Sequence, residues 1–284
     1  MTTTRSMKDM WPEVAESLLL PAESVKLNRL QLFNKITGGF RPNEFSILCG
    51  ATGVGKTTLC ANWSACFVDE KVPHYIASVE TGPHDYVRRV LSVYANRDWN
   101  NGERVEPEDF DAVFNEHEEK LVNEYTRVSI YEDRFGVDTL MADIDREIAE
   151  HGIKIAIIDN LNFFLDAHSD SSAIQEMDRV VHKLIIFCKT RPIHMIMVMH
   201  PRKTDNGRVM SEYDVKGSST AIQEAHNVFL FNRAGQDLID DNYAIPNDRE
   251  LMIAKMRRRG KYVRSRLVLR TTNGVKYVEE RHVE

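Results

Sequence analysis

Residues 45–58 have the sequence FSILCGATGVGKTT, in which an apolar run leads into a glycine-rich turn that contains Lys56 and Thr57. From Gly50 to Thr57 the chain fits the pattern G-x-x-x-x-G-K-[ST] in full. The apolar run before the pattern predicts a strand, and residues 58–68 after it have helical character. A glycine-rich turn between a strand and a helix is typical of a phosphate-binding loop, or P-loop.

Each residue type in this loop has a physical role in holding ATP or another nucleoside triphosphate. Glycines let the backbone curl so that its N–H groups point at phosphate oxygens, and the following helix adds the positive end of its dipole. Lys56 would supply charge to the β- and γ-phosphates, and Thr57 would offer a hydroxyl to Mg²⁺. The predicted nucleotide contacts are Gly50, Ala51, Thr52, Gly53, Val54, Gly55, Lys56, Thr57 and Thr58. The alternative is a glycine-rich turn without a ligand.

Around the P-loop, short apolar runs alternate with amphipathic stretches. The predicted strands are 45–49, 75–79, 128–131, 153–158, 193–199, 228–231 and 251–256. This alternation predicts an α/β fold, with a mostly parallel sheet covered by helices on both faces. After residue 225 the apolar runs follow each other closely, which predicts an antiparallel extension at one edge of the sheet.

Two acidic residues end predicted strands downstream of the P-loop. Asp159 follows the apolar run of 153–158, and a carboxylate at the carboxyl end of a neighbouring strand can reach the shell of a bound Mg²⁺. We therefore predict that Asp159 and Thr57 hold the metal. Asn160 is neutral, so the base must come from elsewhere. Glu80 ends the strand of 75–79 and should emerge at the same edge, where it could polarise the attacking water. The alternative is a capping or surface role for Glu80.

Composition narrows the class of protein. The net charge is −6, so any nucleic-acid contact must come from local basic segments. No stretch reaches the roughly 18–20 apolar residues of a membrane span, and the N-terminus lacks a signal-peptide pattern, which together predict a cytosolic location and no membrane partner. The four cysteines lie in apolar runs without a CxxC pair, which predicts reduced core residues and no zinc site.

Two segments stand apart from the strand–helix alternation. Residues 1–28 are predicted to be an N-terminal arm or linker, with a short amphipathic piece at 11–20 that packs on its own domain or on a neighbouring subunit. Residues 29–284 form the predicted motor domain. The strongly acidic stretch 106–124 has one apolar side, and a solvated helix face is its expected role.

The run LFNKITGGFRPNE at 32–44, leading into the P-loop, resembles the entry to the motor domain of DnaB-type hexameric replicative helicases. The closest likeness is to bacteriophage primase–helicases and the related mitochondrial helicase. The resemblance covers residues 30 to about 280 and follows the order of the family's motifs. It implies a RecA-like P-loop fold and an NTP hydrolase that uses ATP or another NTP with Mg²⁺.

The resemblance also assigns roles at the ends of three strands. The family's catalytic glutamate falls on Glu80 and its Walker B aspartate on Asp159. His200 takes the place of a polar residue that senses the γ-phosphate and links it to a DNA-binding loop, and a histidine is the phage-type choice. Without the resemblance, a structural histidine would be a strong alternative.

Two further motifs of the family concern nucleic acid and the neighbouring subunit. The polar, basic segment 201–208 is predicted to be an exposed loop, and DVKGSS at 214–219 resembles the family's Asp-x-Arg/Lys-Gly-Ser motif. Predicted nucleic-acid contacts are Arg202, Lys203, Arg208, Lys216 and Gly217. The alternative is an ordinary loop with scattered lysines. Lys255 and Arg257 match a Lys-x-Arg pair that projects into the neighbouring subunit's ATP site, where an arginine finger can be worth ~10³–10⁵ in rate.

These observations favour an ATP-dependent helicase or translocase that works as a hexameric ring of identical chains on single-stranded DNA. A primase or other replication proteins are further candidate partners, and either a stand-alone motor or a piece of a larger primase–helicase fits the short segment before residue 30. Two alternatives share the same core chemistry: a RecA/RadA-like recombinase that forms filaments, and a KaiC-like regulatory ATPase without a nucleic-acid partner.

Overall fold

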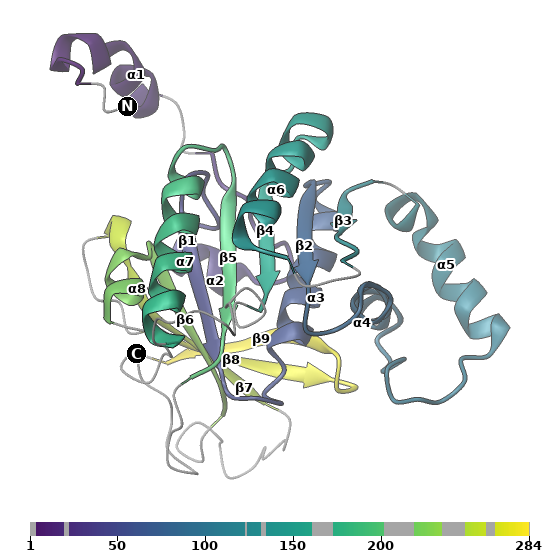
Figure 1. Ribbon diagram of the computed structural model, residues 1–284. Helices are drawn as coiled ribbons and strands as arrows, with labels where there is room; N and C mark the ends of the chain where they lie inside the picture. The colour runs from purple at the N-terminus through teal and green to yellow at the C-terminus, as the bar shows by residue number, and fades with distance from the viewer. Residues whose placement is uncertain are drawn as a thin grey trace.

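The computed structural model describes residues 4–19, 23–122, 124–131, 135–160, 173–201, 219–234, 248–259 and 265–283 (Figure 1). These residues form a nine-stranded sheet in the order β3-β2-β4-β5-β1-β6-β7-β8-β9. The strands are β1 Phe45–Gly50, β2 His74–Ser78, β3 Thr126–Val128, β4 Ile155–Asp159, β5 His194–Met199, β6 Asn227–Arg233, β7 Arg249–Met256, β8 Ser265–Thr272 and β9 Lys276–Val283. The pairs from β3 to β6 are parallel, and those from β6 to β9 are antiparallel. The predicted α/β class and its antiparallel extension are therefore confirmed.

Helices cover both faces of the parallel part. The helices of the described chain are α1 Met7–Leu19, α2 Gln31–Thr37, α3 Lys56–Asp69, α4 Pro83–Ala95, α5 Pro107–Leu121, α6 Val137–His151, α7 Ala173–Lys189 and α8 Ser219–Glu224, of which α1 and α5 lie away from the sheet (Figure 1). One buried cluster joins the sheet to α6, α7 and α8, and a second joins its other face to α2, α3 and α4. Every residue of β1, β2, β4 and β5 is buried, because helices cover these strands on both faces. Their sequences are accordingly mainly apolar rather than alternating.

The edge strand β3 differs from its sequence-based boundaries. The apolar run 128–131 predicts a strand there, but β3 ends at Val128. Among the described strands it pairs only with β2, which ends at Ser78, so little template remains beyond this point. The side chain of Ile130 is 72% exposed, and the Tyr131 hydroxyl instead donates to Asp143 of α6 at 2.9 Å.

The N-terminal helix α1 stands away from the sheet and its covering helices (Figure 1). Its apolar side chains are largely exposed: Met7, Met10, Trp11, Val14, Leu18 and Leu19. Closer to the sheet, Val25 pairs with Phe40 in an isolated bridge and Leu27 is fully buried. The division into an arm at 1–28 and a motor domain at 29–284 stays a prediction, and the residues of the arm nearest to 29 pack against the body.

The acidic stretch forms α5, which has no buried residue and lies at the side of the molecule beyond α4 (Figure 1). The predicted core cysteines Cys49, Cys60, Cys66 and Cys188 are all buried and unbridged. Among the described helices, none combines the length and the apolar character needed to cross a membrane.

Candidate nucleotide site

The P-loop connects β1 to α3 through glycines that no other residue could replace without strain. Gly53 and Gly55 have positive φ angles of 75° and 101°. A Cβ atom on Gly55 would lie 2.7 Å from the hydroxyl of Tyr277, and one on Gly50 would lie 2.7 Å from the carbonyl oxygen of Phe231. The loop is therefore shaped both by its own dihedral angles and by close contact with β6 and β9.

Residues of the antiparallel extension also form hydrogen bonds with the P-loop and with helix α3 that follows it. Arg249 of β7 donates from Nε to the carbonyl oxygen of Val54 at 2.8 Å. Asn62 of α3 donates to the carbonyl oxygen of Val275 at 2.8 Å and accepts from the backbone N–H of Tyr277 at 2.9 Å. These supporting residues are absent from the sequence-based prediction, because only the pairing of β6 to β9 brings them beside the P-loop.

Lys56 begins α3 with its side chain folded back over the loop. It is 6% exposed, and its ammonium donates to the carbonyl oxygens of Gly50 at 2.8 Å and Ala51 at 3.0 Å. Burial lowers its pKa, while the charge of Asp159 acts in the opposite direction. Its Nζ lies 3.3 Å from Nδ1 of His200. A phosphate group would offer this buried cation stronger acceptors than the carbonyls do.

Thr57 and Asp159 form the predicted metal pair. The Thr57 hydroxyl donates to Oδ2 of Asp159 at 2.7 Å. Asp159 is 1% exposed, and its Oδ1 atom has no hydrogen-bond partner among the described residues. Burial raises the pKa of Asp159 to about 6. A buried carboxylate oxygen without a partner, next to a hydroxyl, fits Mg²⁺, which takes one or two carboxylates and completes its shell with substrate phosphates and water.

Glu80, Asn160 and His200 lie close together at the carboxyl ends of the parallel strands, where the P-loop also lies. They follow β2, β4 and β5, which are neighbours in the sheet, so parallel pairing brings their carboxyl ends together. The Asn160 amide donates to Oε2 of Glu80, and its Nδ2 lies 3.0 Å from Nε2 of His200. His200 Nε2 is also 3.5 Å from Oε2 of Glu80, whose side chain is 44% exposed. On its other side, His200 Nδ1 lies 3.4 Å from the hydroxyl of Thr52. Asn160 thus connects the predicted base to the predicted sensor, a role that its neutral charge alone did not reveal.

Lys255 and Arg257 lie at the opposite edge of the sheet. Lys255 pairs with Val228 of β6, which in turn pairs with Ile47 of β1. The P-loop begins at Gly50, three residues further along β1 than Ile47. At about 3.3 Å per residue, Lys255 therefore lies roughly 10 Å below the start of the P-loop along the strand direction. The two cations therefore lie away from the P-loop of their own chain. The predicted nucleic-acid contacts Arg202, Lys203, Arg208, Lys216 and Gly217 lie outside the described residues.

Comparison with known proteins identifies the family and the fold of this chain. A family model described as an AAA domain matches residues 16–206. The chain belongs to this AAA domain family. The matched part of this chain includes the P-loop, Glu80, Asp159 and His200, and it ends before Lys255.

Solved structures show which fold this AAA domain has. One of them, an isolated ATPase domain, superposes with a TM-score of 0.77 at 14% identity, over 98% of this chain and all of that one. A DnaB-like replicative helicase, studied with its primase interactions, gives a TM-score of 0.74 at 15% identity, over 97% of this chain and 67% of that one. A KaiC-like protein from Pyrococcus horikoshii gives 0.62 at 18% identity, over 92% of this chain and all of that one. The AAA domain therefore has the RecA-like fold of DnaB-type motor domains.

Proposed function

We propose that this protein is an NTP-driven helicase or translocase on single-stranded DNA, and that it hydrolyses ATP at the interfaces of a homo-oligomeric ring. One observation carries the proposal: Lys56, Thr57, Glu80, Asp159 and His200 meet at one edge of the sheet, while Lys255 and Arg257 lie at the other. A site divided between two edges is completed only when a second copy presents its basic edge to the P-loop. Similarity in fold to the DnaB-like replicative helicase, over 97% of this chain, supports the same class of motor.

The chemistry at the P-loop edge follows from the residues present. Thr57 and Asp159 would hold Mg²⁺, which neutralises charge on the phosphate oxygens when bound. Glu80 is partly exposed and held by Asn160, so its carboxylate is accessible to a water molecule that it can orient and deprotonate. His200 touches both Lys56 and the Glu80 group, which places it between the phosphate end of the site and the base.

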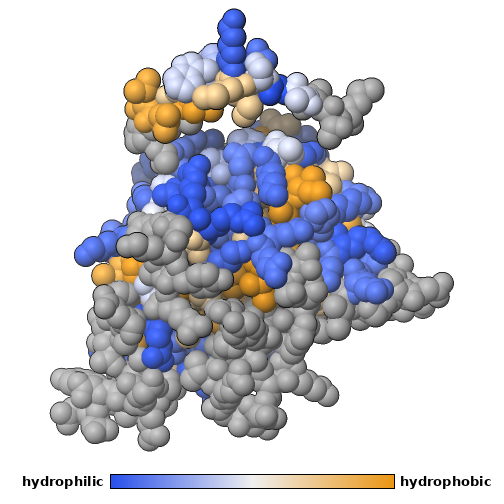
Figure 2. Space-filling model, turned by 90° about the vertical axis from the view of Figure 1, so that its left-hand side faces the viewer, coloured by the Kyte–Doolittle hydropathy of each residue, from blue (hydrophilic) through white to orange (hydrophobic). Residues whose placement is uncertain are grey.

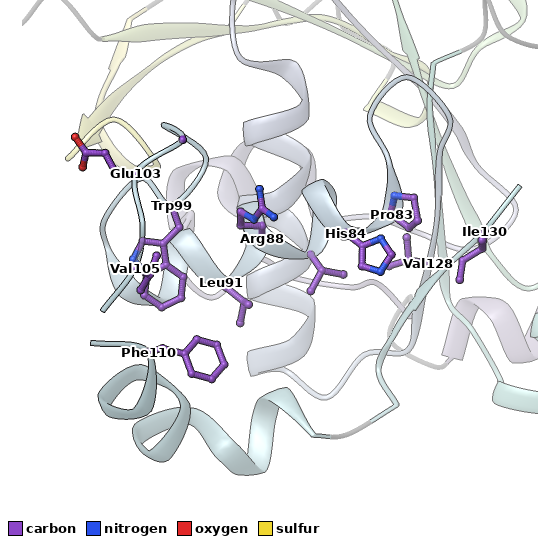
Figure 3. Close-up of a pocket in the computed structure, with 12 residues that line it drawn as sticks. Pro83, His84, Arg88, Leu91, Trp99, Glu103, Val105, Phe110, Val128 and Ile130 are labelled. Atoms are coloured by element: carbon purple, nitrogen blue, oxygen red, sulfur yellow. The ribbon is translucent and has the colours of Figure 1, made fainter. Parts of the chain in front are cut away.

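The arm offers one half of an interface between copies. Figure 2 shows α1 above the body of the molecule, with apolar side chains along the helix and both hydrophilic and hydrophobic patches on the coloured surface below it. The other half is a hollow of about 670 Å³ between α4, α5 and β3 (Figure 3). Its apolar lining consists mainly of Val87, Leu91, Trp99, Phe110, Val128 and Ile130. We place α1 of one copy in this hollow of the next.

The polar residues of the two surfaces are of mixed charge. His84, Arg88 and Glu103 line the hollow, and α1 carries Asp9, Glu13 and Glu16 on its polar side. An amphipathic helix with exposed apolar residues commonly binds in such a groove. The contact would link neighbouring subunits independently of the nucleotide.

The basic segment 202–208 and the motif around Lys216 are the proposed contacts to DNA backbone phosphates. Because lysine and arginine contacts to phosphates release counterions from the DNA, this binding should weaken as the salt concentration rises. A primase or another replication protein is a candidate partner of the assembled ring.

The decisive experiment mixes two inactive variants, Lys56→Ala and Arg257→Ala, and measures ATP hydrolysis with native mass on the same samples. The proposal expects activity to return, because a Lys56→Ala subunit can lend Arg257 to the intact P-loop of its neighbour. Mixtures that form rings but stay inactive would refute the divided site.

A second measurement compares ATP hydrolysis with and without an oligothymidylate strand over a range of salt. Stimulation by the strand supports a DNA motor. Hydrolysis rates that the strand does not change at any salt concentration would instead favour a non-motor ATPase. The fold of this chain is also similar to that of the KaiC-like protein, which represents this class. Electron microscopy separates rings from recombinase-type filaments.

A further inference from the structure

Two hydroxyl groups close the turn that carries Glu80. The turn runs from Ser78, the last residue of β2, to Thr81, shortly before α4 begins at Pro83. The Ser78 hydroxyl has one hydrogen, which it donates to the carbonyl oxygen of Thr81 at 2.7 Å. The Thr81 hydroxyl lies 2.9 Å from Oγ of Ser78, so Thr81 is the donor of this second bond. The two bonds join the residues on either side of Glu80 and fix the shape of the turn.

The backbone of the same turn is attached to β4. Ser78 pairs with Asp159 at the end of the parallel ladder between β2 and β4. The backbone N–H groups of Val79 and Glu80 both donate to the carbonyl oxygen of Asp159, at 2.9 and 3.2 Å. The residue whose carboxylate is the proposed metal ligand therefore also fixes the backbone of the proposed base. The separation of metal and base then depends on the shape of the turn.

Ser78 restrains the turn from its buried side. Ser78 is 5% exposed, whereas the side chain of Glu80 is 44% exposed. The N-cap of α4 is Gly82, which has no side chain that could close the turn. A buried hydroxyl group costs free energy unless it is hydrogen-bonded, and serine commonly bonds to the backbone of a turn that follows it. The contacts of Ser78 thus hold the turn and leave the carboxylate of Glu80 accessible to water.

Resting on the proposed function, we infer that Ser78 and Thr81 are positioning residues for the catalytic base. Neither residue needs to touch the reacting atoms, because both act on the backbone from which Glu80 reaches the attacking water. Asn160 holds the carboxylate at the other end of the same side chain. Backbone and carboxylate are therefore restrained separately. A displacement of about 1 Å in a catalytic group can cost about 100-fold in rate.

The test measures single-turnover ATP hydrolysis with Mg²⁺ and the protein in excess, together with the affinity for a fluorescent ATP analogue. Ser78→Ala should lower the hydrolysis rate by about 10–100-fold and change the affinity by less than about twofold, because the P-loop is unaltered. Thr81→Val removes only the second bond and should cause a smaller loss. Thr81→Ser keeps the hydroxyl group and should hydrolyse ATP at nearly the wild-type rate.

The same substitutions in a Glu80→Gln background separate positioning from a general effect. There, Ser78→Ala should cause no further loss of the residual rate, because Ser78 acts only through Glu80. Ser46→Ala is the matched control. Ser46 is also fully buried, its hydroxyl lies 2.7 Å from Nε2 of His194, and it is at the other end of β1 from the P-loop. Ser46→Ala should lose stability in urea unfolding and keep the wild-type rate.

A Ser78→Ala variant with the wild-type rate would overturn the inference. Equal losses from Ser78→Ala in the wild-type and Glu80→Gln backgrounds would also overturn it, as would a parallel loss of nucleotide affinity or an equal loss of rate in Ser46→Ala. Failure of the proposed function is seen separately. Glu80→Gln would then hydrolyse ATP at the wild-type rate, or mixtures of Lys56→Ala and Arg257→Ala would stay inactive.

Discussion

Replacing Gly55 by alanine should destabilise the protein far more than the same change at Gly53. Both glycines have positive φ, 101° at Gly55 and 75° at Gly53, so each alanine adopts a backbone that costs it ~1–2 kcal/mol. Only at Gly55 does the new Cβ meet an obstacle, the Tyr277 hydroxyl at 2.7 Å; a Cβ on Gly53 has no neighbour within 4 Å. The Tyr277 ring is 3% exposed and packs against Phe231 with ring centroids 5.7 Å apart, so it cannot swing aside freely.

Overpacking of this kind costs ~1–3 kcal/mol, which gives a total of roughly 2–5 kcal/mol for Gly55→Ala and ~1–2 kcal/mol for Gly53→Ala. Urea unfolding followed by circular dichroism measures both. Adding Tyr277→Phe to Gly55→Ala removes the obstructing oxygen and should recover ~1–3 kcal/mol, while the same addition to Gly53→Ala should recover nothing. Equal losses at the two glycines, or no recovery with Tyr277→Phe, would refute the packing of β9 against the P-loop.

Three further predictions concern the site and the arm. Burial raises the pKa of Asp159 to about 6, above the unfolded value, so ionisation of the carboxyl group lowers the stability of the fold as pH rises through about 6. Without Mg²⁺, Asp159→Asn should therefore raise the free energy of unfolding by up to roughly 3 kcal/mol above about pH 7, and by nothing near about pH 4. Thermal unfolding across pH measures this difference. Asn160→Ala should lower kcat by ~10–100-fold with nucleotide affinity retained, because Glu80 loses the amide that holds it; a wild-type kcat would exclude that positioning role. Trp11→Asp should weaken ring assembly by about 30-fold or more in native mass measurements while Trp11→Phe stays assembled, since a central interface Trp is worth ~2–4 kcal/mol. Intact rings with Trp11→Asp would place α1 elsewhere.

Strand direction accounts for the distance between the P-loop and the basic residues Lys255 and Arg257. Parallel pairing places all carboxyl ends of β1, β2, β4 and β5 at one edge. The antiparallel return of β7 necessarily ends at the opposite edge, where Lys255 and Arg257 follow. The topology of the sheet thus separates Lys255 and Arg257 from the P-loop of the same chain. In the proposed function, assembly of subunits would bring the two groups of residues together.

The residues of the P-loop could be predicted from the sequence because their geometry is local. Gly50 to Thr57 are consecutive, and the turn they form depends mainly on their own dihedral freedom between one strand and one helix. The central strands were equally predictable, since burial on both faces leaves a continuous apolar run. Asp159 and Glu80 followed from the rule that parallel strands share a carboxyl edge.

Tertiary structure alone decided which distant side chains complete that loop. Tyr277 and Arg249 support the P-loop only because β6 to β9 fold back beside β1, a register that no local pattern encodes. Asn160 gained its partners from the order of β2, β4 and β5. Local propensity and burial specify the elements, whereas long-range strand pairing determines which of their side chains meet.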